Sequence, residues 1–276
     1  MLPAYPQASS TSIQRPTYLE NDSVNPFYAF NILSSLAATA LRTGAGIATS
    51  GSIKQPAELL ELYEFEGCPH CRLVREVLTE LDLDALIKPC PKAGERFRPE
   101  VVQRGGKAQF PYFIDPNTGA EMYESADIIS YLYQTYGSGT VPLRWRALDL
   151  QRLGSVLASM TRLGAGVRVR ASVAPAKPLE LFSFESSPFA RPVRDLLCEL
   201  EIPYILRSMG RASLEDWLPP GVRGSHDHYA GGTRNRQFLQ QRAGHVAVPY
   251  LIDSNTNTEM AESSAIMEYL RKHYAV

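Results

Sequence analysis

The sequence contains little cysteine, no long apolar run and no excess of positive charge. Its 276 residues include four cysteines, which are too few for a small disulfide-stabilised scaffold. Lys and Arg number 28 against 29 Asp and Glu, which gives a net charge of −1, so we expect no nucleic-acid partner. The longest apolar stretch, residues 32–41, is about half the roughly 20 residues that a bilayer span needs. We therefore expect no membrane span.

The amino-terminal segment has a different composition from the rest of the chain. Residues 1–28 are rich in Ser, Thr, Pro and Asn and show no hydrophobic period, so we expect a flexible tail. No basic region precedes the first apolar stretch, which argues against a secretory signal. The Ser and Thr content is compatible with a plastid transit peptide, whereas Glu20 and Asp22 argue against one. With 44% apolar and 21% charged residues, the chain as a whole has the composition of a globular protein.

The chain contains an internal duplication. Residues 60–83 and 179–202 are identical at 12 of 24 positions, and residues 110–132 and 248–270 are identical at 13 of 23. The offset between copies grows from 119 to 138 residues, so the second copy carries an insertion around residues 214–234. The copies are preceded by similar small-residue segments that end in Arg-x-Gly-Ala-Gly, which we interpret as a helix with its stop signal.

Each copy has the same predicted order of elements. A short strand is followed by an amphipathic helix, a second strand, a polar helix, two further strands and a last helix. This βαβαββα order is that of the thioredoxin fold, so the fold class is α/β with two tandem thioredoxin-fold domains, each preceded by a helix. The expected divisions are a tail (1–28), a first unit with its leading helix (29–138, core 58–137), a helical linker (139–177) and a second unit (178–276).

Several motifs of the first copy occur in a family-specific order. They are the run Cys68-Pro69-His70-Cys71 before the first helix, an internal Phe110-Pro111, and Glu124-Ser125 opening the last helix. In this order the motifs resemble those of glutaredoxins and of the amino-terminal domain of glutathione S-transferases. The duplicated arrangement resembles the tandem proteins of this type from plants and cyanobacteria. The resemblance implies that glutathione is the cosubstrate.

The paired cysteines are the candidate catalytic residues. Cys68 is expected just before a helix, where unpaired backbone N–H groups favour its thiolate, and Cys71 is expected to be more buried and to resolve a mixed disulfide. A protonated His70 would add positive charge beside the Cys68 sulfur. Cys-Pro-His-Cys also occurs in periplasmic disulfide oxidases, which implies an oxidising pair. A structural or metal-binding pair is the alternative, but the sequence lacks a second cysteine pair, and we predict no metal site.

The resemblance also assigns glutathione-binding residues in the first copy. Pro111 matches the family's cis-proline, where the backbone of the preceding Phe110 pairs with the cysteinyl part of glutathione. Glu124 and Ser125 match the pair that binds the γ-glutamyl carboxylate at a helix N-terminus. A plain helix cap is the competing interpretation of Ser125. Lys107 is a candidate for the glycyl carboxylate.

The second copy departs from the cysteine motif. Ser187 replaces Cys68 and Ala190 replaces Cys71, so dithiol exchange is impossible there. The remaining candidates for glutathione binding in this copy are Ser187, Val248, Pro249, Glu262 and Ser263. Ser187 is placed as in serine-type glutathione transferases, but those enzymes complete their site with an all-helical domain that does not follow here. A structural role for the second unit is the alternative.

Three further features could have either a structural or a functional role. Cys90 follows the second strand, on the edge expected to hold Cys68, so it is either a third redox thiol or an ordinary loop cysteine. Cys198 falls on the apolar face of a helix and is expected in the core. His226 and His228 in the insertion could ligate a metal, but no further ligand clusters with them.

The leading hypothesis from the sequence is a glutathione-dependent thiol–disulfide oxidoreductase with a redox-inactive second unit. The alternatives are a glutathione transferase or isomerase, and a non-catalytic scaffold that binds glutathione or a metal. The expected partners are glutathione and a disulfide-bearing protein or small molecule. Reduced-thiol chemistry without an export signal indicates the cytoplasm, or the plastid stroma as the alternative.

Overall fold

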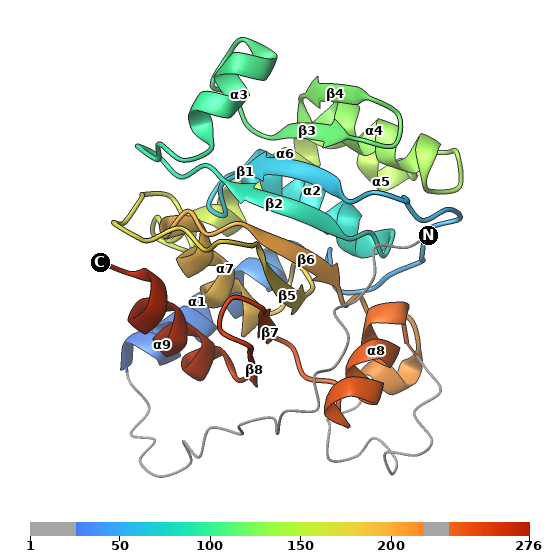
Figure 1. Ribbon diagram of the computed structural model, residues 1–276. Coiled ribbons are helices and arrows are strands. Elements are labelled where there is room, and N and C mark those ends of the chain that lie inside the picture. The colour runs from blue at the N-terminus through green and yellow to red at the C-terminus, as the bar shows by residue number, and fades with distance from the viewer. Residues whose placement is uncertain (1–25, 218–231) are drawn as a thin grey trace.

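The computed structural model describes residues 26–217 and 232–276 (Figure 1). Each copy of the duplication forms the predicted βαβαββα unit. In the first unit the elements are β1 (Leu60–Glu64), α2 (Pro69–Glu80), β2 (Ala85–Pro89), α3 (Arg98–Gly105), β3 (Tyr112–Asp115), β4 (Ala120–Tyr123) and α4 (Ser125–Thr135). In the second they are β5 (Leu179–Ser183), α7 (Ala190–Glu199), β6 (Tyr204–Ser208), α8 (Arg234–Ala243), β7 (Tyr250–Asp253), β8 (Thr258–Ala261) and α9 (Ser263–Tyr274). The expected fold is thus confirmed.

The remaining helices precede the two units or lie in the insertion. They are α1 (Pro26–Leu41), α5 (Leu143–Arg146), α6 (Leu148–Met160) and the short 3₁₀ helix η1 (Leu214–Trp217). Among the described residues, none of the helices combines the length and apolarity that a bilayer-spanning segment requires.

The two units share one eight-stranded sheet. Its strand order is β4-β3-β1-β2-β6-β5-β7-β8, and the two halves meet where β2 pairs with β6 in antiparallel fashion, with Leu86 opposite Ile205. Within each unit the first two strands are parallel and the last two are antiparallel. Strands β2 and β6, which would each be an exposed edge in a separate unit, are therefore paired with one another.

The core continues from one unit into the other. Leu62 and Leu181 face α2, α4, α7 and α9 on one side of the sheet, in a single apolar cluster that contains residues of both units. Their neighbours Tyr63 and Phe182 point to the opposite side, where α3 and α8 cover two smaller clusters. This alternation is the period of two expected for strands covered on both faces.

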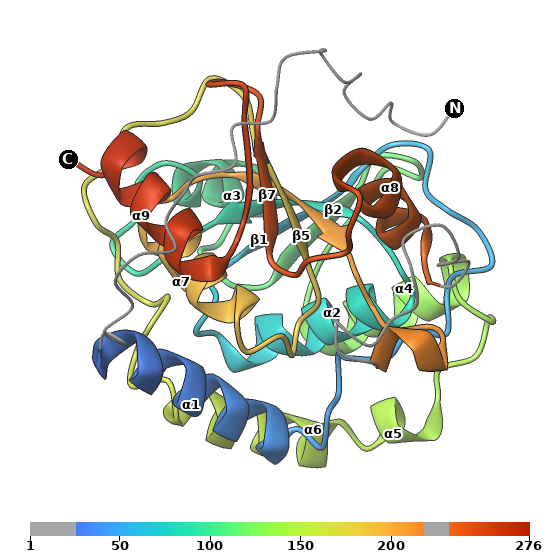
Figure 2. The same cartoon turned by 90° about the horizontal axis from the view of Figure 1, so that it is seen from below.

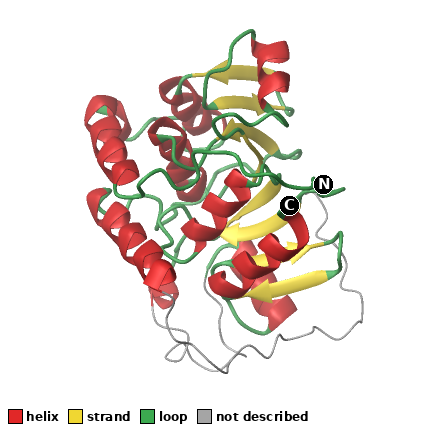
Figure 3. Ribbon diagram, turned by 90° about the vertical axis from the view of Figure 1, so that its left-hand side faces the viewer, coloured by secondary structure: helices red, strands yellow, loops and turns green. Residues whose placement is uncertain are grey.

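Helices α1 and α6 form a third layer outside the helices that cover the sheet (Figures 2 and 3). They lie antiparallel, since Arg42 at the end of α1 donates to Gln151 near the start of α6, and Arg162 after α6 donates to Asn31 in α1. Their placement is crossed. Helix α1, which precedes the first unit, contacts α7 of the second, whereas α6 packs on α2 of the first.

The helices do not follow two of the expected boundaries. Helix α1 begins at Pro26, so the last residues of the expected tail are helical, because proline suits the first turn of a helix; residues 1–25 lie outside the described residues. The linker 139–177 is helical only up to Met160, since the chain then turns through Gly164 and Gly166, both with positive φ. Of the insertion, residues 218–231, including His226 and His228, lie outside the described residues.

Candidate active site

The Cys68 sulfur lies at the amino terminus of α2. Cys68 is the N-cap residue, and its Sγ accepts a hydrogen bond from the Cys71 backbone N–H at 3.3 Å. The hydrogen bond from the Cys71 thiol lowers the pKa of Cys68 from the ordinary value of a thiol. The N–H groups of Cys71 and His70 and the charge of Arg75 act in the same direction, against the opposing effect of burial. The local field therefore favours the thiolate.

The two thiols are differentiated in the predicted sense. The Cys71 side chain is fully buried, and burial together with its hydrogen bond to Cys68 raises its pKa well above the ordinary value. Cys68 retains 4% of its surface exposed. Both cysteines are present as free thiols. The surroundings thus favour the thiolate of Cys68 and the protonated thiol of Cys71.

The chain segment after α6 covers one side of the Cys68 loop. The Gly67 N–H donates to the Gly166 carbonyl at 3.3 Å, and a Cβ at Gly67 would lie 2.4 Å from Val167 Cγ2. Glycine is required at position 67 by this close approach. On the other side of the loop, the Ser155 hydroxyl of α6 donates to the Pro69 carbonyl at 2.7 Å. Helix α6 and the segment that follows it therefore help to shape the thiol site.

The structure brings the predicted glutathione-binding segments together. The Phe110–Pro111 peptide is cis, as predicted, and the Phe110 ring lies edge-on to Phe65, at a centroid distance of 6.2 Å, just before the Cys68 loop. Gln109 donates to the Glu124 carboxylate, which links the cis-proline loop to the start of α4. Three segments far apart in sequence thus converge beside Cys68.

Ser125 opens α4 with an unusual preceding residue. Glu124 has a φ of +63°, and Ser125 is 1% exposed. Within the described part of the chain, no group makes a hydrogen bond with Ser125 Oγ. A buried hydroxyl without a partner is costly in a folded protein, so Ser125 Oγ is free to bond a polar group that enters the site. By contrast, the side chains of His70 and Lys107 are exposed, and Lys107 Nζ lies 4.6 Å from the centroid of the Tyr123 ring.

The second unit repeats this geometry without the thiols. Ser187 Oγ accepts from the Ala190 N–H at 3.2 Å, as the Cys68 sulfur does from Cys71. The Val248–Pro249 peptide is cis, and Glu262 before Ser263 has a φ of +74°. All five residues predicted for this unit therefore occupy positions equivalent to those of the first.

Comparison with known proteins assigns the family. The family model of the glutathione S-transferase N-terminal domain matches residues 62–140 and again residues 181–275, together more than half of the chain. The chain belongs to this family. It is a tandem member, because both units match separately.

The solved structures contain a partial relative of this glutathione S-transferase N-terminal-domain protein. A glutathione transferase from Bombyx mori is 27% identical over 38% of this chain and 50% of that chain, with a TM-score of 0.28. The chain thus spans about half the length of this solved transferase. No curated protein matches the chain.

Each unit of this family member opens its last helix with a buried serine. The unpartnered Ser125 hydroxyl and the amino terminus of α4 are suited to a carboxylate. Within residues 26–217 and 232–276, no group of three or more His, Cys, Asp or Glu side chains could hold a metal ion.

The remaining cysteines are buried in the tandem protein. Cys90 is fully buried, and burial raises the pKa of its thiol far above the ordinary value, which favours the structural interpretation over a redox one. Cys198 lies in the core as expected, where its Sγ accepts from the Glu66 N–H at 3.3 Å.

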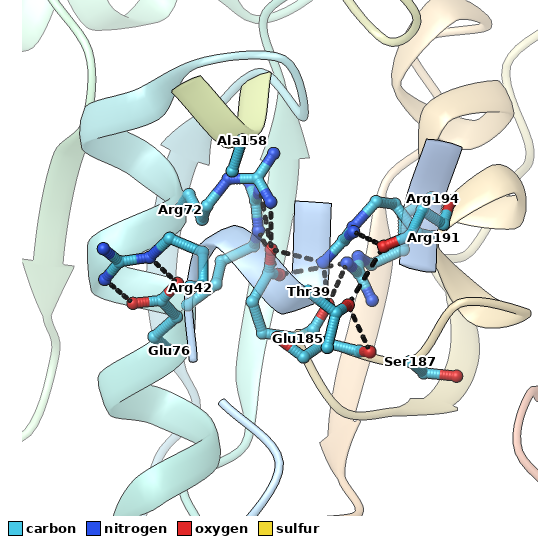
Figure 4. A network of polar contacts seen from close by, with 12 residues as sticks. Thr39, Arg42, Arg72, Glu76, Ala158, Glu185, Ser187, Arg191 and Arg194 are labelled. Atoms are coloured by element: carbon cyan, nitrogen blue, oxygen red, sulfur yellow. Dashed lines mark hydrogen bonds and ion pairs between the residues drawn. The ribbon is translucent and has the colours of Figure 1, made fainter. Parts of the chain in front are cut away.

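A buried charge network joins the two units behind the thiol site, and the sequence did not reveal it (Figure 4). Arg75 of α2 donates to Glu185 at 2.8 Å, and Arg194 of α7 donates to Glu66 at 2.9 Å. Nearby arginines hold the pKa of Glu185 far below its usual range despite burial, with Arg194 the largest contributor. The signal that could have indicated this network is the repetition of both arginines and both glutamates at equivalent positions of the two copies.

Proposed function

We propose that this protein is a glutathione-dependent thiol–disulfide oxidoreductase in which Cys68 is the nucleophile. The observation that carries the proposal is the Cys68 sulfur at the α2 amino terminus, with a lowered pKa beside a protonated, buried Cys71. A thiolate reacts with disulfides far faster than a thiol does. The chemistry uses reduced glutathione and fits a reducing compartment such as the cytoplasm or plastid stroma.

The reaction begins with attack of the Cys68 thiolate on the glutathione sulfur of a mixed disulfide. A Cys68–glutathione disulfide forms, and the substrate leaves as a thiolate that takes a proton from solvent. Cys71 then loses its proton and attacks the Cys68 sulfur, which forms the Cys68–Cys71 disulfide and releases glutathione. Two further glutathione molecules reduce this disulfide and leave as oxidised glutathione.

Glutathione would be positioned by the three segments that converge beside Cys68. Its γ-glutamyl carboxylate would accept from Ser125 Oγ and the N–H groups that open α4. Its cysteinyl backbone would pair with Phe110, before the cis-proline Pro111. Lys107, whose side chain is exposed, would face the glycyl carboxylate.

Reduction of a glutathione mixed disulfide tests the proposal. We expect Cys68→Ser to lower the rate at least 100-fold, whereas Cys71→Ser retains turnover through direct attack of glutathione on the Cys68 mixed disulfide. Cys90→Ala is the matched control and should retain the wild-type rate. Full activity of the Cys68→Ser variant would refute the proposal. Conjugation of glutathione to a chloronitroarene that depends on Ser187 would instead favour a transferase.

A further inference from the structure

The two Glu-Ser sites of this protein differ in one contact. Both serines open a helix after a glutamate with positive φ, and both are buried, with 1% of Ser125 and 2% of Ser263 exposed. The Ser125 hydroxyl has no hydrogen-bond partner in the described ranges. The Ser263 hydroxyl has one, because the Tyr28 hydroxyl lies 2.6 Å from it. The site in the second unit is therefore already filled by a side chain of the same protein.

Tyr28 reaches Ser263 because α1 is fixed along the second unit. Arg191 of α7 donates to the Ser35 carbonyl at 2.9 Å, and the Thr39 hydroxyl donates to the Ser186 carbonyl at 3.0 Å. These bonds hold the middle and the end of α1 beside the Ser187 loop, in the view of Figure 4. Tyr28, at the start of the same helix, also packs against the main core cluster. The contact with Ser263 is thus part of a continuous interface.

By sequence, the first unit lacks a counterpart of this hydroxyl at the aligned position. Aligning Arg-x-Gly-Ala-Gly after α1 with the same motif after α6 gives an offset of 120 residues, which pairs Tyr28 with Leu148. A leucine side chain has no group that can bond a serine hydroxyl. The difference between the two sites therefore follows from the sequences of the two leading helices.

We propose that Tyr28 excludes glutathione from the second unit by occupying the position of its γ-glutamyl carboxylate, so that the chain binds a single glutathione, at Ser125. The inference rests on the proposed glutathione binding by the first unit. A ligand carboxylate could bond Ser263 only after the amino-terminal turn of α1 had moved away. The second unit thus retains the carboxylate site of the family but keeps it closed.

Titration calorimetry with reduced glutathione on the full chain tests this inference. We expect one equivalent to bind the wild type and at least tenfold weaker binding for Ser125→Ala. Adding Tyr28→Ala to Ser125→Ala should restore one equivalent, and adding Ser263→Ala to that pair should abolish it again. The matched control adds Phe30→Ala to Ser125→Ala. It removes an exposed side chain of α1 but leaves the Tyr28 hydroxyl in place, so it should restore no binding.

The outcomes separate this inference from the proposed function. Two equivalents bound by the wild type, or no binding by a folded Ser125→Ala/Tyr28→Ala variant, would overturn the role of Tyr28. Tyr28→Phe removes the hydroxyl but keeps the ring, so it serves as a second variant if the alanine change unfolds α1. Absence of wild-type binding together with binding by the Tyr28 variants would overturn glutathione binding by the first unit and leave the closure of the second supported.

Discussion

At the scale of single residues, the duplication allows the surroundings of the Cys68 thiol to be compared with those of the equivalent Ser187. Cys68 and Ser187 accept an equivalent hydrogen bond, from the backbone N–H three residues later. What differs is the residue one turn later, which is the protonated Cys71 in the first unit and Ala190 in the second. The thiol of Cys71, rather than the helix alone, thus gives the largest lowering of the Cys68 pKa.

The reactivity of Cys68 should depend on pH through this contact. Its alkylation by iodoacetamide should follow a titration whose midpoint lies below that of an ordinary thiol. Cys71→Ala removes the hydrogen bond that stabilises the thiolate, so the midpoint should move to higher pH. Rates are measured by mass spectrometry of the intact protein between pH 5 and pH 10. A wild-type midpoint at or above that of a model thiol, or an unmoved midpoint in Cys71→Ala, contradicts the assignment.

At the scale of elements, each of the crossed helices α1 and α6 is followed by a buried arginine that bonds a carboxylate. Arg42 donates two hydrogen bonds to Glu76, at 2.8 and 2.6 Å, and Arg162 donates to Asp195 at 2.5 Å. These arginines are the conspicuous residues of the repeated Arg-x-Gly-Ala-Gly motif, for which helix packing and capping were expected. The motif also fastens each helix end to the unit that follows it in sequence.

Removal of Arg42 should destabilise the fold strongly. Arg42→Ala leaves the Glu76 carboxylate buried without its partner, which typically costs about 3–5 kcal/mol in the free energy of unfolding. The surface pair of Arg152 and Asp149 provides the control, because Arg152→Ala should change stability by about 0.5 kcal/mol or less. Urea denaturation measures both. Equal effects of the two substitutions would show that the buried pair contributes no more than an exposed one.

The elements of each unit could be predicted because the duplication gives two independent examples of one pattern. The joining of the sheets could not, because Leu86 and Ile205 have the same alternation with their neighbours whether their strand is an edge or is paired. In the site, the position of Cys68 followed from its motif. Tyr28 did not, since it lies outside both repeats and its contact with Ser263 spans 235 residues.

At the scale of the whole molecule, the continuous sheet and the buried charges make the two units interdependent. Glu185 of the second unit pairs with Arg75 of the first as well as with Arg194 of its own. Separating the units would leave these groups without partners and would open the edges of β2 and β6. The second unit therefore supports the thiol site even without thiols of its own.

Unfolding should accordingly be a single cooperative event. Trp145 is buried against the shared core, and its fluorescence in a Trp217→Phe variant reports on the first unit, whereas far-ultraviolet circular dichroism reports on both units. The two transitions should coincide in urea, and Glu185→Ala should lower both midpoints together, by about 3 kcal/mol or more of stability. Separate transitions, or a loss confined to one probe, would mean that the units fold independently.

The crossed position of α1 has a consequence for synthesis on the ribosome. This helix is translated before the second unit that it contacts, because Ser186 and Ser263 lie 147 and 235 residues after their partners Thr39 and Tyr28. At about 5–20 residues per second, the Tyr28 hydroxyl waits roughly 10–50 s for Ser263 to be translated. Throughout that interval this helix, which carries no charged residue, lacks its contact with Ser263. Helix α1 thus completes its contacts with the second unit only after most of that unit has been translated.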